Sequence, residues 1–299
     1  MLKRVLTGAV ILILTLGFVL LKQVSPLFFD AMVLIISIGS ILEVSKAYKE
    51  SGKQVSTIGL IFATCMFCII FNLEKNLYRA FLYEFLTVLM LLAGFLTIDI
   101  ITFAMNRKHG TTEPDVSKLN SELFDQTKYS MMALVYPVVV LSFLYAMNHM
   151  NYQVGYMGII TAFAVSMLTD TMALFIGIAC GKTKFVPEVS PKKTVEGMIG
   201  GIVGGFVGSM LCFIVFYFTP WFALEQISLL NSLFAFIFVG IFGSFINQLG
   251  DLIASALKRK VGIKDYSHIF PAHGGFMDRV DGLMFTALFV YLIFALLLV

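Results

Sequence analysis

GMIGGIVGGFVG, residues 197–208, contains two interleaved series of glycines, at positions 197, 201 and 205 and at positions 200, 204 and 208. Within each series the glycines recur every four residues. Small residues at this spacing let two helix backbones approach closely in lipid. The stretch therefore predicts a membrane helix that packs tightly against a neighbouring helix.

The composition of the whole chain is that of an integral membrane protein. Hydrophobic residues make up 59% and charged residues 13% of the 299 residues, against about 45–50% and about 25% in soluble domains. Membrane spans bury their apolar surface in lipid and in contacts with one another, so we expect one integral membrane domain. The net charge of +3 is too small to indicate binding to nucleic acid.

Nine apolar runs are long enough to cross about 30 Å of hydrocarbon. They lie at 5–21, 27–45, 55–73, 80–104, 130–148, 154–180, 197–219, 230–256 and 279–299. The first run lacks the small-x-small cleavage site of a signal peptide, so it is predicted to be a span. The predicted fold is an all-α, polytopic helical bundle with about nine transmembrane helices.

The basic residues predict the orientation of these spans. With the N-terminus in the cytoplasm, only Lys22, Lys75 and Arg79 of the 21 lysines and arginines fall on the outer side, as the positive-inside rule requires. We expect residues 1–150 to hold about five spans and a cytoplasmic loop at 105–129. Residues 151–299 would then form a catalytic region with cytoplasmic loops at 181–196 and 257–279. The compact length points to the plasma membrane of a bacterium.

A polar stripe runs along the predicted span at 230–256. Its members are spaced by three or four residues and therefore share one helix face. They are Ser244, Asn247, Gln248, Asp251, Ser255 and Lys258. A carboxylate in the middle of a membrane costs roughly 2.5–3.5 kcal/mol, which favours a wet or cationic cavity around Asp251. The alternative is a stripe that only ties helices together, and the same choice stays open for Asp170.

KDYSHIFPAHGGFMDRVDGLMF, residues 264–285, concentrates acids and bases around a pair of glycines. Pro271, Gly274 and Gly275 prevent a continuous helix, so the chain forms a loop before the last span begins near Asp278. A helix N-terminus attracts phosphate. Asp278 and Asp281 share a helix face and can offer hard oxygen ligands to Mg²⁺. Beside basic residues and a membrane, this pattern favours phosphoryl-group chemistry on a lipid.

The segment SALKRKVGIKDYSHIFPAHGGFMDRVD, residues 255–281, resembles the signature of the phosphatidate cytidylyltransferases, also called CDP-diacylglycerol synthases. That signature is S-x-x-K-R, four residues, K-D, and then H-G-G-x-x-D-R-x-D, and every position is matched. SPKKTVEG, residues 190–197, is also similar to the family, so the likeness covers roughly residues 166–282. Leu174 and Ile178 stand where family members often have tyrosine and arginine.

The resemblance implies a reaction in which CTP and phosphatidic acid, a membrane lipid, give CDP-diacylglycerol and pyrophosphate. It implies a requirement for Mg²⁺, with a second metal ion left open. Asp251 and Asp278 are the implied metal ligands, and Asp281 is a weaker candidate. The implied catalytic residues are Ser255, Lys258, Arg259, Lys264, His273 and Arg279. The implied substrate-binding residues are Lys192, Lys193, Gly274 and Gly275, although both lysines also suit a role as membrane anchors.

Other classes of protein fit the sequence less well. A transporter would show internal repeats, and none is visible. Membrane transferases that consume CDP-diacylglycerol use D-G-x-x-A-R, whereas Asp281 and Gly282 are followed by LMFT, without the alanine and arginine. Another phospholipid or polyprenol phosphotransferase remains an alternative. A homodimer is left open.

Overall fold

The computed structural model describes residues 2–109, 124–222, 228–270 and 274–298. Its described part contains seven helices long and apolar enough to cross a membrane, and the shorter apolar helix α3 (Thr57–Leu73). Four of the seven are α2 (Pro26–Glu50), the first part of α4 (Leu77–His109), α8 (Tyr152–Cys180) and α9 (Val195–Tyr217). The helix α1 (Leu2–Leu21) covers the first predicted run.

The other three long helices are interrupted. One consists of α6 (Asp125–Ala133), the π-helical segment η1 (Leu134–Val139) and α7 (Val140–Asn148). The next consists of α10 (Leu229–Phe238), the π-helical segment η4 (Val239–Gly243) and α11 (Ser244–Lys260). The last consists of α12 (Met277–Val280) and α13 (Leu283–Leu297). Each predicted run thus falls on a helical segment, which confirms the polytopic helical bundle of about nine helices.

A small β-hairpin and a short 3-10 helix, η2 (Pro220–Phe222), are the additions to this helical fold among the described residues. The strands β1 (Lys184–Val186) and β2 (Ser190–Thr194) pair antiparallel, with Lys184 opposite Thr194. The hydroxyl of Thr194 then accepts from the backbone N–H of Gly197 at 3.1 Å and caps the start of α9. The predicted cytoplasmic loop at 181–196 is therefore an ordered hairpin that leads directly into the glycine-rich helix.

The glycines of α9 face two neighbouring helices. A Cβ atom at Gly204 would lie 2.5 Å from the carbonyl oxygen of Leu168 in α8, and one at Gly197 would lie 2.9 Å from that of Ala173. On the other side, a Cβ atom at Gly201 would lie 2.8 Å from Nε2 of Gln248 in α11. The predicted tight helix packing is confirmed, and it places α8, α9 and α11 against one another.

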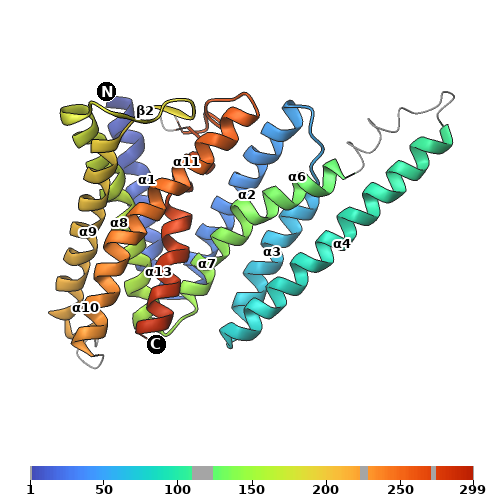
Figure 1. The fold of residues 1–299 in the computed structure, drawn as a ribbon. Coiled ribbons are helices and arrows are strands. Elements are labelled where there is room, and N and C mark those ends of the chain that lie inside the picture. The colour runs from blue at the N-terminus through green and yellow to red at the C-terminus, as the bar shows by residue number, and fades with distance from the viewer. Residues whose placement is uncertain (1, 110–123, 223–227, 271–273, 299) are drawn as a thin grey trace.

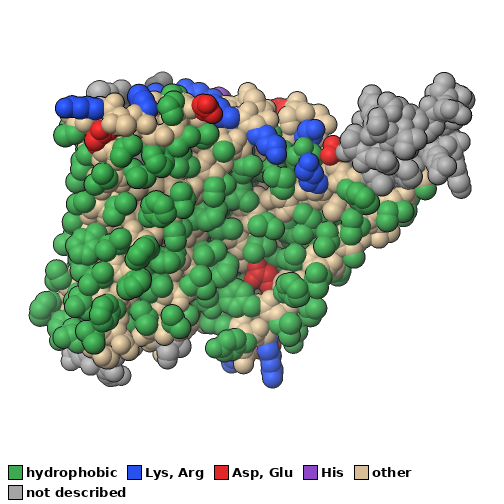
Figure 2. Space-filling model, viewed as in Figure 1, with side chains coloured by type: hydrophobic (Ala, Val, Ile, Leu, Met, Phe, Trp, Pro, Cys, Tyr) green, Lys and Arg blue, Asp and Glu red, His purple; other side chains and the backbone are tan. Residues whose placement is uncertain are grey.

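The ends of several elements share one edge of the molecule. The N-terminus, the hairpin and the end of α11 lie at the top in Figure 1, whereas the C-terminus lies at the opposite edge. Lysine and arginine side chains line the top edge in Figure 2, and hydrophobic side chains cover most of the face below. We call the edge with the hairpin and the end of α11 the basic edge.

A buried polar cluster connects the turn after α1 to α2 and α7. The buried amine of Lys22 donates to Oδ1 of Asn148 at 2.6 Å, and the amide of Asn148 donates to Asp30 at 2.8 Å. His149 Nε2 lies 2.9 Å from the same carboxylate. Burial lowers the pKa of Lys22 to about 8, against the opposing influence of Asp30. The cluster contains none of the predicted site residues.

Candidate active site

An acidic cavity of about 220 Å³ lies between the middle of α8, α11, the loop after α11 and α12. Five aspartates line it beside two cationic side chains. The lining residues are Ser166, Asp170, Asp251, Lys258, Asp265, Asp278, Arg279, Asp281, Gly282 and Leu283. The structure therefore places together the three predicted metal ligands, Lys258 and Arg279, and it adds Asp170, which the sequence left open.

Asp278 organises the described part of the loop between α11 and α12, residues 261–270 and 274–276, which we call the glycine loop. The amine of Lys258 lies 2.7 Å from Oδ1 of Asp278. The backbone N–H groups of Tyr266 and Gly275 donate to Oδ2 at 3.1 and 3.0 Å. Burial raises the pKa of the Tyr266 phenol. Both oxygens of Asp278 are thus engaged by groups that shape the loop.

Both glycines of the pair are required by close contacts. Gly274 has φ +78°, a left-handed conformation that favours glycine. A Cβ atom there would lie 2.7 Å from Oδ2 of Asp278, and one at Gly275 would collide with the carboxylate of Glu43. The interruption of the helix at Gly274 and Gly275 is confirmed, and the backbone approaches the protein's own carboxylates. Substrate binding by these glycines stays a prediction.

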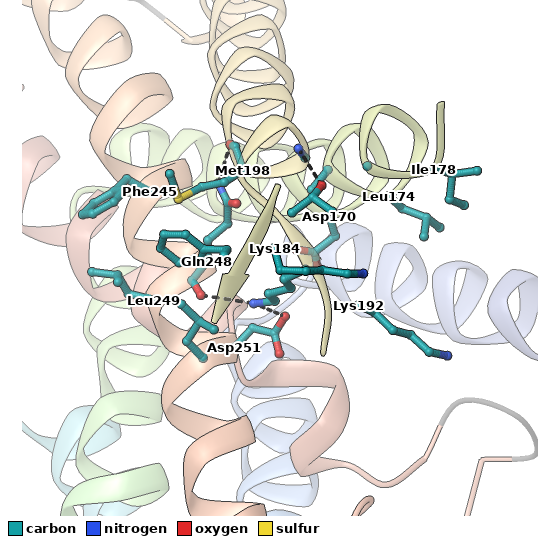
Figure 3. Close-up of a pocket in the computed structure, with 17 residues that line it drawn as sticks. Asp170, Leu174, Ile178, Lys184, Lys192, Met198, Phe245, Gln248, Leu249 and Asp251 are labelled. Atoms are coloured by element: carbon teal, nitrogen blue, oxygen red, sulfur yellow. Dashed lines mark hydrogen bonds and ion pairs between the residues drawn. The ribbon is translucent and has the colours of Figure 1, made fainter. Parts of the chain in front are cut away.

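A second cavity, the hairpin pocket, lies between the hairpin, α8, α9 and α11 and measures about 550 Å³. Figure 3 shows Lys184 and Lys192 of the hairpin together with Asp170 and Asp251 of the helices around this pocket. The amine of Lys193, which also lines the pocket, lies 2.7 Å from Oδ2 of Asp251. Both predicted substrate-binding lysines therefore line this pocket, and Lys193 is paired with a predicted metal ligand.

The departure from the family pattern falls inside this pocket. Leu174 and Ile178 of α8 line the pocket, and both side chains are largely exposed. They give the pocket an apolar wall where the family signature often has tyrosine and arginine. The helix α8 thus borders the pocket through these two side chains.

A third cavity, the apolar groove, separates α1 from α8 and measures about 430 Å³. Its polar end is formed by Asp170 and Arg279, and the rest is mainly hydrocarbon. The lining residues are Ile11, Thr15, Leu16, Val19, Ile160, Phe163, Ala164, Ser166, Met167, Asp170, Arg279 and Leu283. Asp170 lines all three cavities, so they meet at this residue.

The polar stripe on α11 has two parts. Asn247 donates to Asp170 at 2.8 Å and accepts from Thr286 at 3.0 Å, so it ties α8, α11 and α13 together. Nearer the basic edge, Ser255 donates weakly to Asp251 at 3.4 Å, and Lys258 reaches Asp278. The stripe therefore serves both of the roles that the sequence left open.

The acidic cavity fits a divalent cation by the chemistry of its donors. Among the described residues, no three Asp, Glu, His or Cys side chains are close enough to hold a metal ion together. Mg²⁺, however, is usually bound by one or two carboxylates together with waters and phosphate oxygens. Within the described part of the chain, Asp251 and Asp281 each accept one hydrogen bond and Asp251 also has an ion pair, whereas Asp278 accepts three hydrogen bonds. The excess of carboxylates over cations provides the charge that such an ion would neutralise.

Among the described residues that were predicted to be catalytic, three do not line the acidic cavity: Ser255, Arg259 and Lys264. The guanidinium of Arg259 donates to the carbonyl oxygens of Val189 and Ile263 at 3.4 and 3.1 Å, which ties the hairpin to α11. Lys264 is exposed on the glycine loop. His273 lies outside the described residues. Phosphate contacts from Arg259 and Lys264 therefore stay predictions.

Glu43, a buried residue of α2, contacts the glycine loop and was not predicted from the sequence. Its carboxylate accepts from the hydroxyl of Ser267 and from the backbone N–H groups of Phe276 and Met277, the latter two at 2.9 Å each. The signal was present, because Glu43 is a carboxylate within the apolar run at 27–45. Like Asp251, Glu43 is therefore a carboxylate that is costly within a span unless polar groups surround it.

The fold and the three cavities define a multi-pass membrane protein whose acidic site joins a basic edge to an apolar groove. The model of the cytidylyltransferase family matches residues 2–297. Phosphatidate cytidylyltransferase from Bacillus subtilis is 30% identical over 294 residues, which cover 98% of this chain and 97% of the relative. The enzymes of that name from Aquifex aeolicus and Staphylococcus aureus (strain COL) are 37% and 35% identical over 165 residues each, about 55% of this chain and 56–57% of theirs.

The chain therefore belongs to the cytidylyltransferase family, as its signature predicted.

Proposed function

We propose that the protein transfers CMP from CTP to phosphatidate, giving CDP-diacylglycerol and pyrophosphate. The observation that carries this proposal is the meeting of three cavities of different chemistry at Asp170. The hairpin pocket offers three lysines to a triphosphate, and the apolar groove offers hydrocarbon to an acyl chain with Arg279 at its polar end. Membership of the family supports the same reaction.

The reaction makes modest demands on proton transfer. A phosphate oxygen of the lipid, already anionic, attacks the α-phosphorus of CTP. The bond between that phosphorus and the oxygen bridging to the β-phosphorus breaks, and pyrophosphate leaves with the electron pair. The main difficulty is to bring two anions together and to stabilise the departing one, which positioning and fixed positive charge accomplish.

Each part of the site has a role in this scheme. Lys184, Lys192 and Lys193 hold the triphosphate at the hairpin, and Arg279 orients the lipid phosphate at the end of the groove. Asp251, Asp278 and Asp281 would hold Mg²⁺, which when bound neutralises phosphate charge and favours departure of pyrophosphate. Lys258 holds Asp278, and with it the glycine loop, in place through their ion pair.

The site faces the cytoplasm in this proposal. The hairpin, the glycine loop and the end of α11 share the basic edge, and the positive-inside rule assigns such an edge to the cytoplasm. Bacterial relatives support the plasma membrane as the location. CTP would then enter from the cytoplasm and phosphatidate from the bilayer.

The test is an assay of the purified protein in detergent with phosphatidate and each of CTP, dCTP, ATP, GTP and UTP. We expect a cytidine-linked lipid, identified by its mass, together with stoichiometric pyrophosphate. Diacylglycerol, which lacks the attacking phosphate, should give no product and serves as the control. Consumption of phosphatidate without a nucleotide-linked lipid would instead favour another phosphotransferase.

A further inference from the structure

We propose that Glu43 is a positioning residue that holds the glycine loop, and through it Asp278, in the catalytic arrangement. Its catalytic consequence rests on the proposed function. Glu43 is 4% exposed and lies on α2, in the half of the chain that carries none of the family motifs. Its carboxylate nevertheless accepts hydrogen bonds from Ser267, Phe276 and Met277 on both sides of the glycine pair.

Contacts along one face of α2 form a seat for the loop. Gly39 and Glu43 are one helical turn apart. A Cβ atom at Gly39 would lie 2.5 Å from the ring of Phe276, and a side chain at Gly275 would meet the Glu43 carboxylate. The glycine loop therefore packs closely on α2 at two points, where Gly39 faces Phe276 and Gly275 faces Glu43.

The segment 275–278 is held from two sides. Glu43 binds the N–H groups of Phe276 and Met277, while Asp278 binds Lys258 and the N–H group of Gly275. A displacement at Met277 is passed directly to its neighbour Asp278, because they are consecutive in the backbone. The position of Asp278 in the acidic cavity thus depends on a contact made by α2.

The chemistry of these hydrogen bonds requires a carboxylate. Every group that Glu43 binds here is a donor, and hydrogen bonds to an ionised acceptor are roughly twice as strong as neutral ones. Glu43 has no ion pair among the described residues, so these donors compensate its buried charge. A glutamine would point an N–H₂ group at a backbone N–H group and leave that donor unpaired.

The test compares Glu43→Gln with a matched control, Glu84→Gln. Glu84 lies on α4, is also 4% exposed, and accepts from Ser142 at 2.6 Å, away from the glycine loop. For Glu43→Gln we expect kcat for CMP transfer to fall about 10- to 100-fold, the usual cost of losing a supporting contact behind a ligand. KM for CTP should change little, because the hairpin lysines are untouched. Glu84→Gln should keep the wild-type kcat.

Hydrogen exchange gives a readout that does not depend on activity. Glu43→Gln should speed exchange at residues 275–278 and leave α8 and α9 unchanged, whereas Glu84→Gln should leave the loop unchanged. Gly39→Ala, which pushes on Phe276 without altering a carboxylate, should reproduce both effects and replaces Glu43→Gln if that variant does not fold. If wild type forms no CDP-lipid, the proposed function fails, while loop exchange still tests the Glu43 contact.

Three outcomes would overturn the inference. The first is wild-type exchange and wild-type kcat in Glu43→Gln. The second is faster loop exchange with unchanged kcat, which would separate the contact from catalysis. The third is an equal loss of activity in Glu84→Gln with faster exchange throughout. Glu43 would then contribute only to the general packing of the helices.

Discussion

Two lysine–aspartate pairs, Lys193–Asp251 and Lys258–Asp278, join motifs that are separate in the sequence, each with the charged atoms 2.7 Å apart. The pairs differ in burial. The side chains of Lys193 and Asp251 are 27% and 36% exposed, whereas those of Lys258 and Asp278 are 11% and 5% exposed. Asp251 can therefore exchange its partner for a metal ion or a substrate more easily than Asp278 can.

This difference predicts distinct consequences for two substitutions of the same kind. Asp251→Asn should lower CMP transfer by at least about 100-fold, the range found for removing one group that stabilises developing charge, while the thermal unfolding temperature in detergent stays near wild type. Asp278→Asn should lower both, because it leaves Lys258 buried without its counter-charge, an arrangement that costs about 3–5 kcal/mol.

Asp125→Asn in the first turn of α6 is the control for both, with activity and unfolding temperature expected at wild-type values. Near-normal turnover of Asp251→Asn at limiting Mg²⁺ would remove Asp251 from the metal-binding set.

Lys192 and Lys193 are expected to contribute to the binding of CTP. Replacing both with glutamine should lower kcat/KM for CTP tenfold or more, equivalent to about 1.4 kcal/mol, because both line the hairpin pocket. The measurement is the initial rate against CTP concentration. Lys260→Gln, at the exposed end of α11, removes a charge from the same edge and should leave kcat/KM unchanged. Wild-type kinetics in the double variant would return both lysines to a role as membrane anchors.

Among the elements, α9 is the helix whose packing follows most directly from sequence. Its glycine spacing predicted close approach, and Gly204 indeed lies against the backbone of Leu168. Gly204→Ala should destabilise the protein by about 1–3 kcal/mol, the usual cost of overpacking, as measured by unfolding in detergent. Gly94→Ala in α4 is the control, because a Cβ atom there meets nothing within 4 Å and should not destabilise. Equal stability of the two variants would contradict the packing of α8 against α9.

Other elements left no usable pattern in the sequence. The hairpin strands cover three and five residues and consist largely of lysine, serine and proline, so they lack the apolar alternation that identifies a strand. The π-helical segment η4 occurs inside an apolar run whose hydropathy does not distinguish one kind of helix from another. The interruption at η1 differs, because it contains Pro137, which cannot continue a regular helix. Spans could thus be placed from composition, whereas the hairpin and η4 could not.

The residues of the candidate site could also be predicted only in part. The polar stripe and the family resemblance predicted Asp251, and the signature predicted Lys258, Asp278, Asp281 and Arg279. The structure places all five around one cavity. Glu43 contacts Phe276 across a separation of 233 residues, and a single sequence carries no record of which spans are neighbours. Arg259 belongs to the signature but turns to backbone carbonyls, because motif membership does not specify the direction of a side chain.

For the molecule as a whole, the proposed reaction requires that the hairpin and the glycine loop face the same compartment. We would replace the four native cysteines and introduce one cysteine at a time at Glu188, Ile269 or Lys75, all exposed. In intact cells an impermeant thiol reagent should label Lys75→Cys only. After the cells are opened it should label all three. Labelling of Glu188→Cys or Ile269→Cys from outside intact cells would contradict the topology.

In the proposed reaction, the lipid attacks the α-phosphorus of CTP. The experiment supplies CTP with radioactive phosphorus at either the α or the γ position, together with phosphatidate and the purified protein. We expect the α label to move into the lipid fraction and the γ label into pyrophosphate, in equal amounts. Recovery of the γ label in lipid, or retention of the α label in water-soluble nucleotide while phosphatidate is consumed, would contradict the proposed reaction.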